Sequence, residues 1–293
     1  MLRTGQIRVD GKRARAGTRL DGGQQVRVPP LARAATPTKE KAPPLPLDRG
    51  EMEALRARVL YRDDDMIAID KPPGLAVQGG SGQTKHLDAL AGALQFEAAE
   101  PPKLVHRLDK DTSGVLLLAR DARAAARLAG LFRSGEVQKT YWAVVVGVPS
   151  PPRGTIDQPL AKRGGPGRER MQPSEQDGLR AVTRYRTIAK AGRDAAWLAL
   201  SPLTGRTHQL RVHCAAVGTP ILHDGKYGGK SAYLSDQVGE IPRRLNLHAR
   251  ELVVPHPDGG NLRIRADLPD HMQASFAALG FDPSSHKAEL DEI

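Results

Sequence analysis

Residues 105–119 read Val-His-Arg-Leu-Asp-Lys-Asp-Thr-Ser-Gly-Val-Leu-Leu-Leu-Ala. Five apolar residues follow Gly114, and a short apolar run of this kind predicts a strand. Asp109 stands just ahead of that strand, between Arg107 and Lys110, and these opposite charges favour its ionised form at neutral pH. An ionised carboxylate at the edge of a strand is able to act as a nucleophile. Taken alone, the same residues are also typical of an ordinary solvated turn.

The composition is that of a soluble protein with one large core and a small appendage, since 39% of the 293 residues are apolar and 26% are charged. No apolar run reaches the roughly 18–20 residues of a membrane span. The first residues lack the apolar segment of a signal peptide, so we expect a cytoplasmic protein. Cys214 is the single cysteine and lies in the apolar run 212–217, which favours a core position over a nucleophile.

The charge balance points to a polyanionic partner. The formal net charge is +11, and 31 of the 44 basic residues are Arg, because 13 are Lys. Arg suits phosphate binding and base stacking better than Lys does. We therefore expect a nucleic acid, RNA or DNA, as the partner.

The chain separates into regions of different composition. Short alternating patterns at 6–9 and 25–28 predict strands, and Asp10-Gly11 predicts a turn after the first. A Pro- and Ala-rich segment is expected to form a linker. The predicted regions are 1–30, 31–54 as the linker, 55–281 as one domain, and 282–293 as a polar tail.

The large domain alternates strand and helix patterns. Strands are predicted at 66–70, 140–146, 182–188, 195–200, 251–254 and 261–265. A helix is predicted between an N-cap at Asp121 and a stop at Gly135. Most of the expected strand connections are antiparallel, so we predict an α+β fold with a mixed, mainly antiparallel sheet and flanking helices.

A second segment rich in polar residues is 203–213, Leu-Thr-Gly-Arg-Thr-His-Gln-Leu-Arg-Val-His. It is expected to open a helix that ends near Gly218, with Arg211 directed into a cleft and Leu210 directed into the core. His208 and His213 are five residues apart, which is not the spacing of a helical zinc pair, so no metal site is expected.

Three ordered motifs resemble the RluA-type RNA pseudouridine synthases. They are His106-Arg107-Leu108-Asp109 with Thr112-Ser113-Gly114, then Lys139-Thr140-Tyr141, then 205–213. The segments Lys71-Pro72-Pro73-Gly74 and Asn246-Leu247-His248-Ala249 extend the resemblance over about residues 55–275. Residues 5–28 resemble the last part of an S4 RNA-binding domain without its two opening helices, which suggests either a start codon assigned too late or a vestige.

The resemblance implies the roles of individual residues. Asp109 would be the essential nucleophile or base, by a glycal, acylal or Michael route, with no metal and no organic cofactor. Arg211 would pair with Asp109, and Tyr141 would stack on the target base. Arg107 would fill the space that the extruded uridine leaves. The remaining substrate-binding residues would be Leu210, lining the uracil pocket, and His106, Arg206 and His208.

The implied substrate is 23S ribosomal RNA or a large-subunit precursor, modified by a monomeric enzyme. The same reaction on transfer RNA remains an alternative, as does a non-catalytic RNA-binding or ribosome-assembly factor. A glycosidase is less compatible with the motifs, because that chemistry normally needs two opposed carboxylates, whereas the expected partner of Asp109 is a cation.

Overall fold

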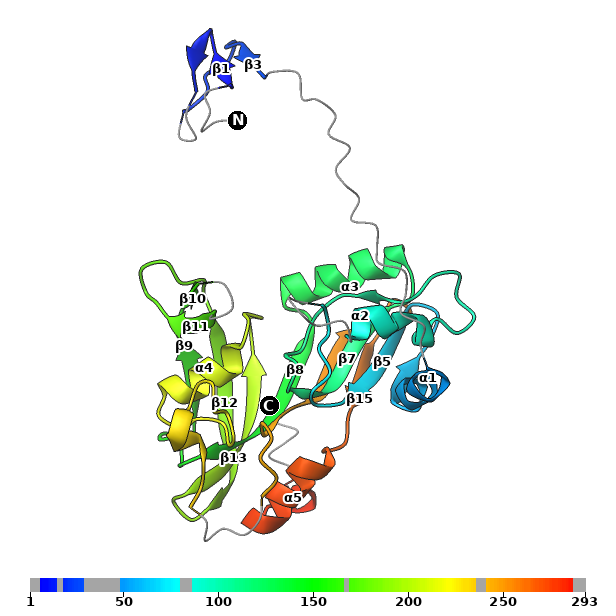
Figure 1. Cartoon of the computed structure of the whole chain (residues 1–293), viewed down its shortest axis with the longest axis vertical. Helices are drawn as coiled ribbons and strands as arrows, with labels where there is room; N and C mark the ends of the chain where they lie inside the picture. The colour runs from blue at the N-terminus through cyan, green and yellow to red at the C-terminus, as the bar shows by residue number, and fades with distance from the viewer. Residues whose placement is uncertain are drawn as a thin grey trace. The chain divides into compact units, whose positions relative to one another are not determined.

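The computed structural model describes residues 6–14, 18–28, 48–79, 86–165, 169–235 and 241–286. The chain divides into two units, 1–45 and 46–293 (Figure 1). In the first unit, β1 (Arg8–Val9) pairs with β2 (Lys12–Arg13) and with β3 (Val26–Arg27). Asp10 and Gly11 have φ values of 47° and 76°, as a two-residue hairpin turn requires. The resemblance to an S4 domain stays a prediction.

The second unit is built on one ten-stranded sheet. Its main path runs β4 (Val59–Arg62), β5 (Met66–Lys71), β7 (Ser113–Ala119), β14 (Leu247–Pro255), β8 (Gln138–Val146), β13 (Ala195–Pro202), β12 (Val182–Ala191), β9 (Arg153–Asp157). In addition, β6 (Lys103–Leu104) pairs with β7, and β15 (Asn261–Arg265) pairs with β14. Every pairing in this sheet is antiparallel except that of β14 with β7. The predicted mixed, mainly antiparallel α+β fold is confirmed.

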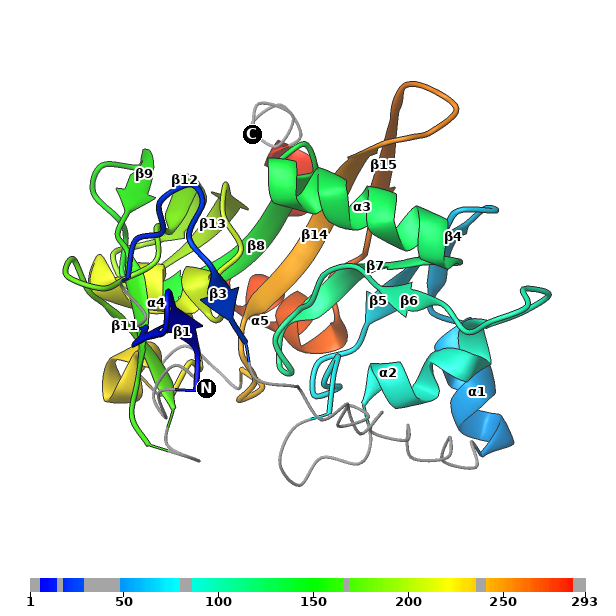
Figure 2. The same cartoon turned by 90° about the horizontal axis from the view of Figure 1, so that it is seen from above.

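Helices flank the sheet on both faces (Figure 2). The helical elements are α1 (Arg49–Arg56), α2 (Leu87–Leu90), α3 (Ala122–Ser134), α4 (Gln209–Ala216) and α5 (Asp270–Leu279), with 3-10 turns η1 (Ala91–Leu94), η2 (Gly229–Ala232) and η4 (Pro283–His286). A small separate pair, β10 (Leu160–Arg163) with β11 (Arg170–Pro173), completes the unit. The predicted helix after Asp121 is α3: the Asp121 carboxylate accepts from the Ala124 amide at 2.7 Å, and Gly135 ends the helix at φ 80°.

The apolar run of β7 is continuous because both faces of the strand are covered. Leu116 and Leu118 pack with residues of α1 and α2, whereas Val115 and Leu117 pack against α3. All four are fully buried. The same alternation holds on β8, where one face packs against α4 and the other against α5.

Gly114 permits the parallel contact between β7 and β14. Its φ is +108°, and a Cβ atom there would lie 2.2 Å from the Ala249 carbonyl oxygen. Only glycine fits so close an approach. The start of β7, a few residues after Asp109, is thereby held against β14 in the middle of the sheet.

Two boundaries differ from the sequence pattern. Helix α1 begins at Arg49, and its Met52 and Leu55 pack into the core, so residues 49–54 of the predicted linker belong to the second unit. Helix α4 begins at Gln209 rather than near Leu203. Residues 31–47 of the predicted linker and 287–293 of the predicted tail lie outside the described residues.

Candidate active site

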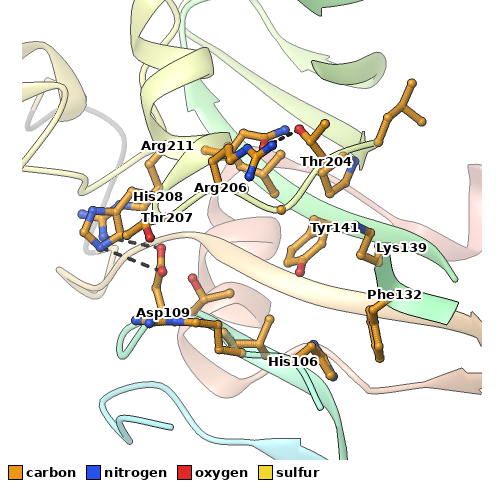
Figure 3. Close-up of a pocket in the computed structure, with 18 of the residues that line it drawn as sticks. His106, Asp109, Phe132, Lys139, Tyr141, Thr204, Arg206, Thr207, His208 and Arg211 are labelled. Atoms are coloured by element: carbon orange, nitrogen blue, oxygen red, sulfur yellow. Dashed lines mark hydrogen bonds and ion pairs between the residues drawn. The ribbon is translucent and has the colours of Figure 1, made fainter. Parts of the chain in front are cut away.

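A cavity of about 530 Å³ opens where the segment before β7, strand β8, the end of β13 and the start of α4 meet. It is lined by all eight residues that the sequence predicted for the site: His106, Arg107, Asp109, Tyr141, Arg206, His208, Leu210 and Arg211. Figure 3 shows Asp109 directed toward His208 and Arg211, with Tyr141 farther along the cavity. The fold therefore brings together three motifs that are far apart in sequence.

Lys71 holds the segment that carries Asp109 in place. This fully buried side chain donates to the carbonyl oxygens of Pro72, Leu75 and Lys110 at 2.9, 2.9 and 3.0 Å. The Gly74 amide donates to the same Lys110 carbonyl at 2.9 Å. Burial lowers the pKa of Lys71 to about 8, although neighbouring carboxylates oppose the shift. The Lys-Pro-Pro-Gly motif was noted in the sequence, but this positioning contact was not predicted.

Gln209 anchors the first turn of α4 to β12. Its side-chain nitrogen donates to the Val182 carbonyl and to the Thr183 hydroxyl, both at 3.0 Å. Its side-chain oxygen accepts from the Arg206 amide at 3.0 Å and from the Thr204 hydroxyl at 2.7 Å. These bonds determine where the helix starts, and so where Arg211 points.

Arg211 has a tighter partner than the predicted one. Its Nε and Nη2 donate to the two carboxylate oxygens of Asp224 at 2.8 and 2.7 Å. Its Nη1 lies 4.0 Å from Oδ2 of Asp109. The predicted Arg211–Asp109 contact is therefore present but loose, and the bidentate partner is Asp224, which the sequence analysis missed.

His208 joins Asp109 to a tyrosine that the sequence analysis also missed. Its Nδ1 lies 2.6 Å from the Tyr227 hydroxyl, and its Nε2 lies 3.9 Å from Oδ1 of Asp109. Burial lowers the pKa of His208, and Asp109 partly offsets that shift. The guanidinium carbon of Arg211 lies 5.1 Å from the Tyr227 ring centroid, within cation–π range. Tyr227 thus contacts both His208 and Arg211, the two basic side chains that face Asp109.

Tyr141 and Leu210 supply an apolar wall. Tyr141 lies on β8, and burial, together with the Asp109 charge, raises the pKa of its hydroxyl above the ordinary value. Leu210 is 7% exposed and lines the cavity with Leu247. A flat aromatic ring beside aliphatic side chains suits a planar, uncharged ligand ring.

His106 lines the cavity, but its ring is engaged with the protein. Its Nε2 accepts the Leu117 amide at 2.8 Å, and the ring stacks on Phe132 with 4.3 Å between centroids. Burial, with a smaller effect from Lys139, lowers its pKa to about 3, so the ring is neutral. These contacts give His106 a positioning role for the segment before Asp109.

The two remaining predicted residues are exposed at the cavity rim. Arg206 donates through Nε to the Arg180 carbonyl at 3.0 Å. Arg107 makes no hydrogen bond or ion pair with any residue that the structure describes. Its guanidinium is therefore available to a ligand.

Within the described ranges, no group of three or more His, Cys, Asp or Glu side chains is placed to hold a metal ion. None of the helices in these ranges is both long and apolar enough to cross a membrane.

Comparison with known proteins gives a consistent result. The family model described as RNA pseudouridylate synthase matches residues 65–216. "Ribosomal large subunit pseudouridine synthase C" of Vibrio cholerae is 36% identical, over 95% of this chain and 86% of that protein. "RNA pseudouridine synthase 4, mitochondrial" of Arabidopsis thaliana is also 36% identical, over 75% of this chain, which spans 59% of the length of that relative.

A solved structure agrees with these matches. "Human RNA Pseudouridylate Synthase Domain Containing 4" superimposes with a TM-score of 0.67 at 34% identity, covering 79% of this chain and 96% of the human one. The fold, the order of the motifs and these similarities together show that the chain belongs to the RluA-type family of RNA pseudouridine synthases.

Proposed function

We propose that this chain converts specific uridines of large-subunit ribosomal RNA, the 23S RNA or its precursor, into pseudouridine, with Asp109 as the catalytic carboxylate. The observation that supports this most directly is the cavity in which Asp109 faces Arg211 at 4.0 Å and His208 at 3.9 Å beside the aromatic wall of Tyr141. A planar base would lie against Tyr141 and Leu210 while its ribose approaches Asp109.

The chemistry needs no redox change. The bond between N1 of uracil and C1′ of ribose breaks, the ring turns in the cavity, and C5 joins C1′; C5 loses a proton and N1 gains one. Asp109 would assist as nucleophile or base. Arg211 would keep it ionised and aimed, and Tyr141 would hold the ring by stacking.

The RNA target is inferred from charge and from similarity. The net charge of +11 favours a polyanionic substrate. The Vibrio cholerae relative carries the large ribosomal subunit in its name and aligns with 95% of the chain. We also propose that the enzyme is cytoplasmic and acts as a monomer; all eight predicted site residues of a single chain line the same cavity, so the proposed chemistry requires no residue from a second copy. A non-catalytic RNA-binding protein would place no demand on a carboxylate among cations.

The experiment is an in vitro assay with the purified chain on unmodified large-subunit ribosomal RNA and on unmodified transfer RNA, followed by mapping of pseudouridines. We expect new pseudouridines in the ribosomal RNA alone. Asp109→Asn should form none while binding RNA within a few-fold of the unaltered protein. Modification of transfer RNA alone would overturn the substrate, and full activity of Asp109→Asn would overturn the catalytic assignment.

A further inference from the structure

A second cavity, of about 630 Å³, lies on the other side of Asp109. Asp109, His208 and Arg211 line both cavities and so form the wall between them. The rest of the second cavity comes from Pro73 and Gly74, Lys110 and Asp111, 223–226 and 243–245. None of the roles proposed above uses this space.

Four exposed cations line the second cavity: Lys110, Lys226, Arg243 and Arg244. None of them forms an ion pair with a carboxylate in the part of the chain that the structure describes. Lys226 donates to the Glu169 carbonyl at 3.2 Å, which leaves its other protons available. Cations on one concave surface without carboxylate partners attract a polyanion.

The carboxylates of the same cavity do not cancel this charge. Asp224 is 1% exposed in its side chain and is bound by Arg211 and by the Tyr227 amide. Asp109 belongs to the wall and faces Arg211 and His208. Asp111 is the remaining carboxylate, against four exposed cations.

The backbone around this cavity is held in an uncommon conformation. His208 and His223 have φ values of 53° and 64°, which are costly for residues other than glycine. Both line the second cavity. Strain of this kind is retained where the surrounding structure fixes it, and it clusters at active sites, ligand-binding segments and switch regions.

We propose that this cavity binds the sugar–phosphate backbone next to the extruded uridine, with Lys226, Arg243 and Arg244 as the phosphate ligands. The inference rests on the proposed function. When a uridine occupies the first cavity with its ribose at Asp109, the chain of the RNA has to leave past that residue. The second cavity begins there, and its guanidinium groups suit phosphate oxygens.

The test compares the variant Lys226→Gln/Arg243→Gln/Arg244→Gln with the matched control Lys190→Gln/Arg123→Gln/Arg193→Gln. The control residues are exposed and line neither cavity. We expect the first variant to raise KM roughly tenfold, with kcat within about threefold, because phosphate contacts contribute binding rather than chemistry. Its plot of log affinity against log salt should lose a slope of about 0.7 for each lost contact with single-stranded RNA. The control should change neither quantity.

Replacing one phosphate of the RNA by a neutral methylphosphonate identifies the phosphate that the second cavity binds. In a series of target RNAs, each with one such replacement at a different position around the uridine, a replacement at a flanking position should lower the affinity of the unaltered protein. The same replacement should not lower the affinity of the Lys226→Gln/Arg243→Gln/Arg244→Gln variant any further. An equal loss in both proteins, or a KM like that of the control, would overturn the proposal.

The two proposals fail in different ways. Absence of pseudouridine formation by the unaltered protein would refute the proposed function. The comparison of binding would still decide the backbone subsite, because it can be repeated on Asp109→Asn, which is expected to bind RNA without turnover.

Discussion

Arg211 binds Asp224 through two hydrogen bonds of 2.8 and 2.7 Å, and only its Nη1 is left to face Asp109, at 4.0 Å. One buried carboxylate thus holds the cation while the other stays outside hydrogen-bond range. This arrangement keeps a positive charge beside Asp109 without engaging the Asp109 oxygens in a tight ion pair. A carboxylate that has to attack carbon or accept a proton benefits from that freedom.

Replacement of Asp224 tests this arrangement. In Asp224→Asn, Arg211 loses its charged partner and is expected to turn toward Asp109. We predict a drop of at least about tenfold in the single-turnover rate, with RNA affinity little changed. Breaking a buried pair from one side also costs about 3–5 kcal/mol of stability, which thermal unfolding would measure. A normal rate in a folded Asp224→Asn protein would show that Arg211 needs no anchor.

Lys71 is the second anchor to test. Lys71→Met removes the three hydrogen bonds that hold the loop around Asp109 and leaves three carbonyl groups without this donor. We predict a turnover rate lower by about tenfold, because small displacements of a catalytic group are costly, and a smaller change in RNA affinity. Lys103→Met, which removes an exposed ion pair with Glu100, serves as the control. Equal rates in the two variants would contradict the positioning role.

The parts predicted from the sequence were those with a local cause. The apolar run of β7, the Asp121 cap and the Gly135 stop each follow from neighbours in the chain, and the three motifs are short and ordered. The Arg211–Asp224 pair has no periodic spacing that links its members. The bond from Lys71 to the Lys110 carbonyl, 39 residues along the chain, and the bond from the Leu117 amide to His106 likewise depend on how the chain folds, so no local pattern could predict them.

The start of α4 illustrates the same limit. The pattern from Leu203 onward is compatible with a helix, yet the helix begins at Gln209, because that side chain bonds to β12 and to the preceding loop. His208 consequently lies outside the helix in a left-handed conformation, where its ring reaches Tyr227. The start of α4 is therefore determined by the bonds between Gln209 and β12, which the local sequence pattern does not show.

Two histidines with lowered pKa values predict a loss of stability in acid. Burial lowers the pKa of His106 to about 3 and that of His248 to about 4. Between about pH 6.5 and pH 4 the unfolded chain takes up protons at these positions and the folded chain does not, so stability falls as the pH falls. Each histidine contributes up to about 1.4 kcal/mol per pH unit.

Urea unfolding at several pH values measures how steeply the free energy of unfolding changes with pH. His106→Gln, which keeps a hydrogen-bond acceptor for the Leu117 amide, should make this pH dependence shallower between about pH 6.5 and pH 4, by the contribution of about one proton. An unchanged pH dependence would mean that His106 is protonated in the folded protein. It would then favour a direct role in binding the RNA over the positioning role inferred from its contacts.

Arg107 is the residue expected to assist extrusion of the target base. It is exposed, lines the cavity beside Asp109, and makes no hydrogen bond or ion pair within the described residues, so it is able to move into RNA. Extruding a stacked uridine costs a few kcal/mol, and a planar guanidinium in the vacated space would recover part of that cost by stacking. Arg107→Ala should therefore slow a stem-loop substrate by about tenfold and an unstructured oligomer by less than about threefold.

Arg107→Lys separates stacking from charge, since it keeps the positive charge and loses the planar group. We expect it to resemble Arg107→Ala on the stem-loop and the unaltered protein on the oligomer, in single-turnover rates measured side by side. Arg123→Ala, on the exposed side of α3, controls for a general loss of charge. If the alanine variant slows both substrates equally and lysine restores both, Arg107 is a phosphate contact, and extrusion depends on another residue of the cavity.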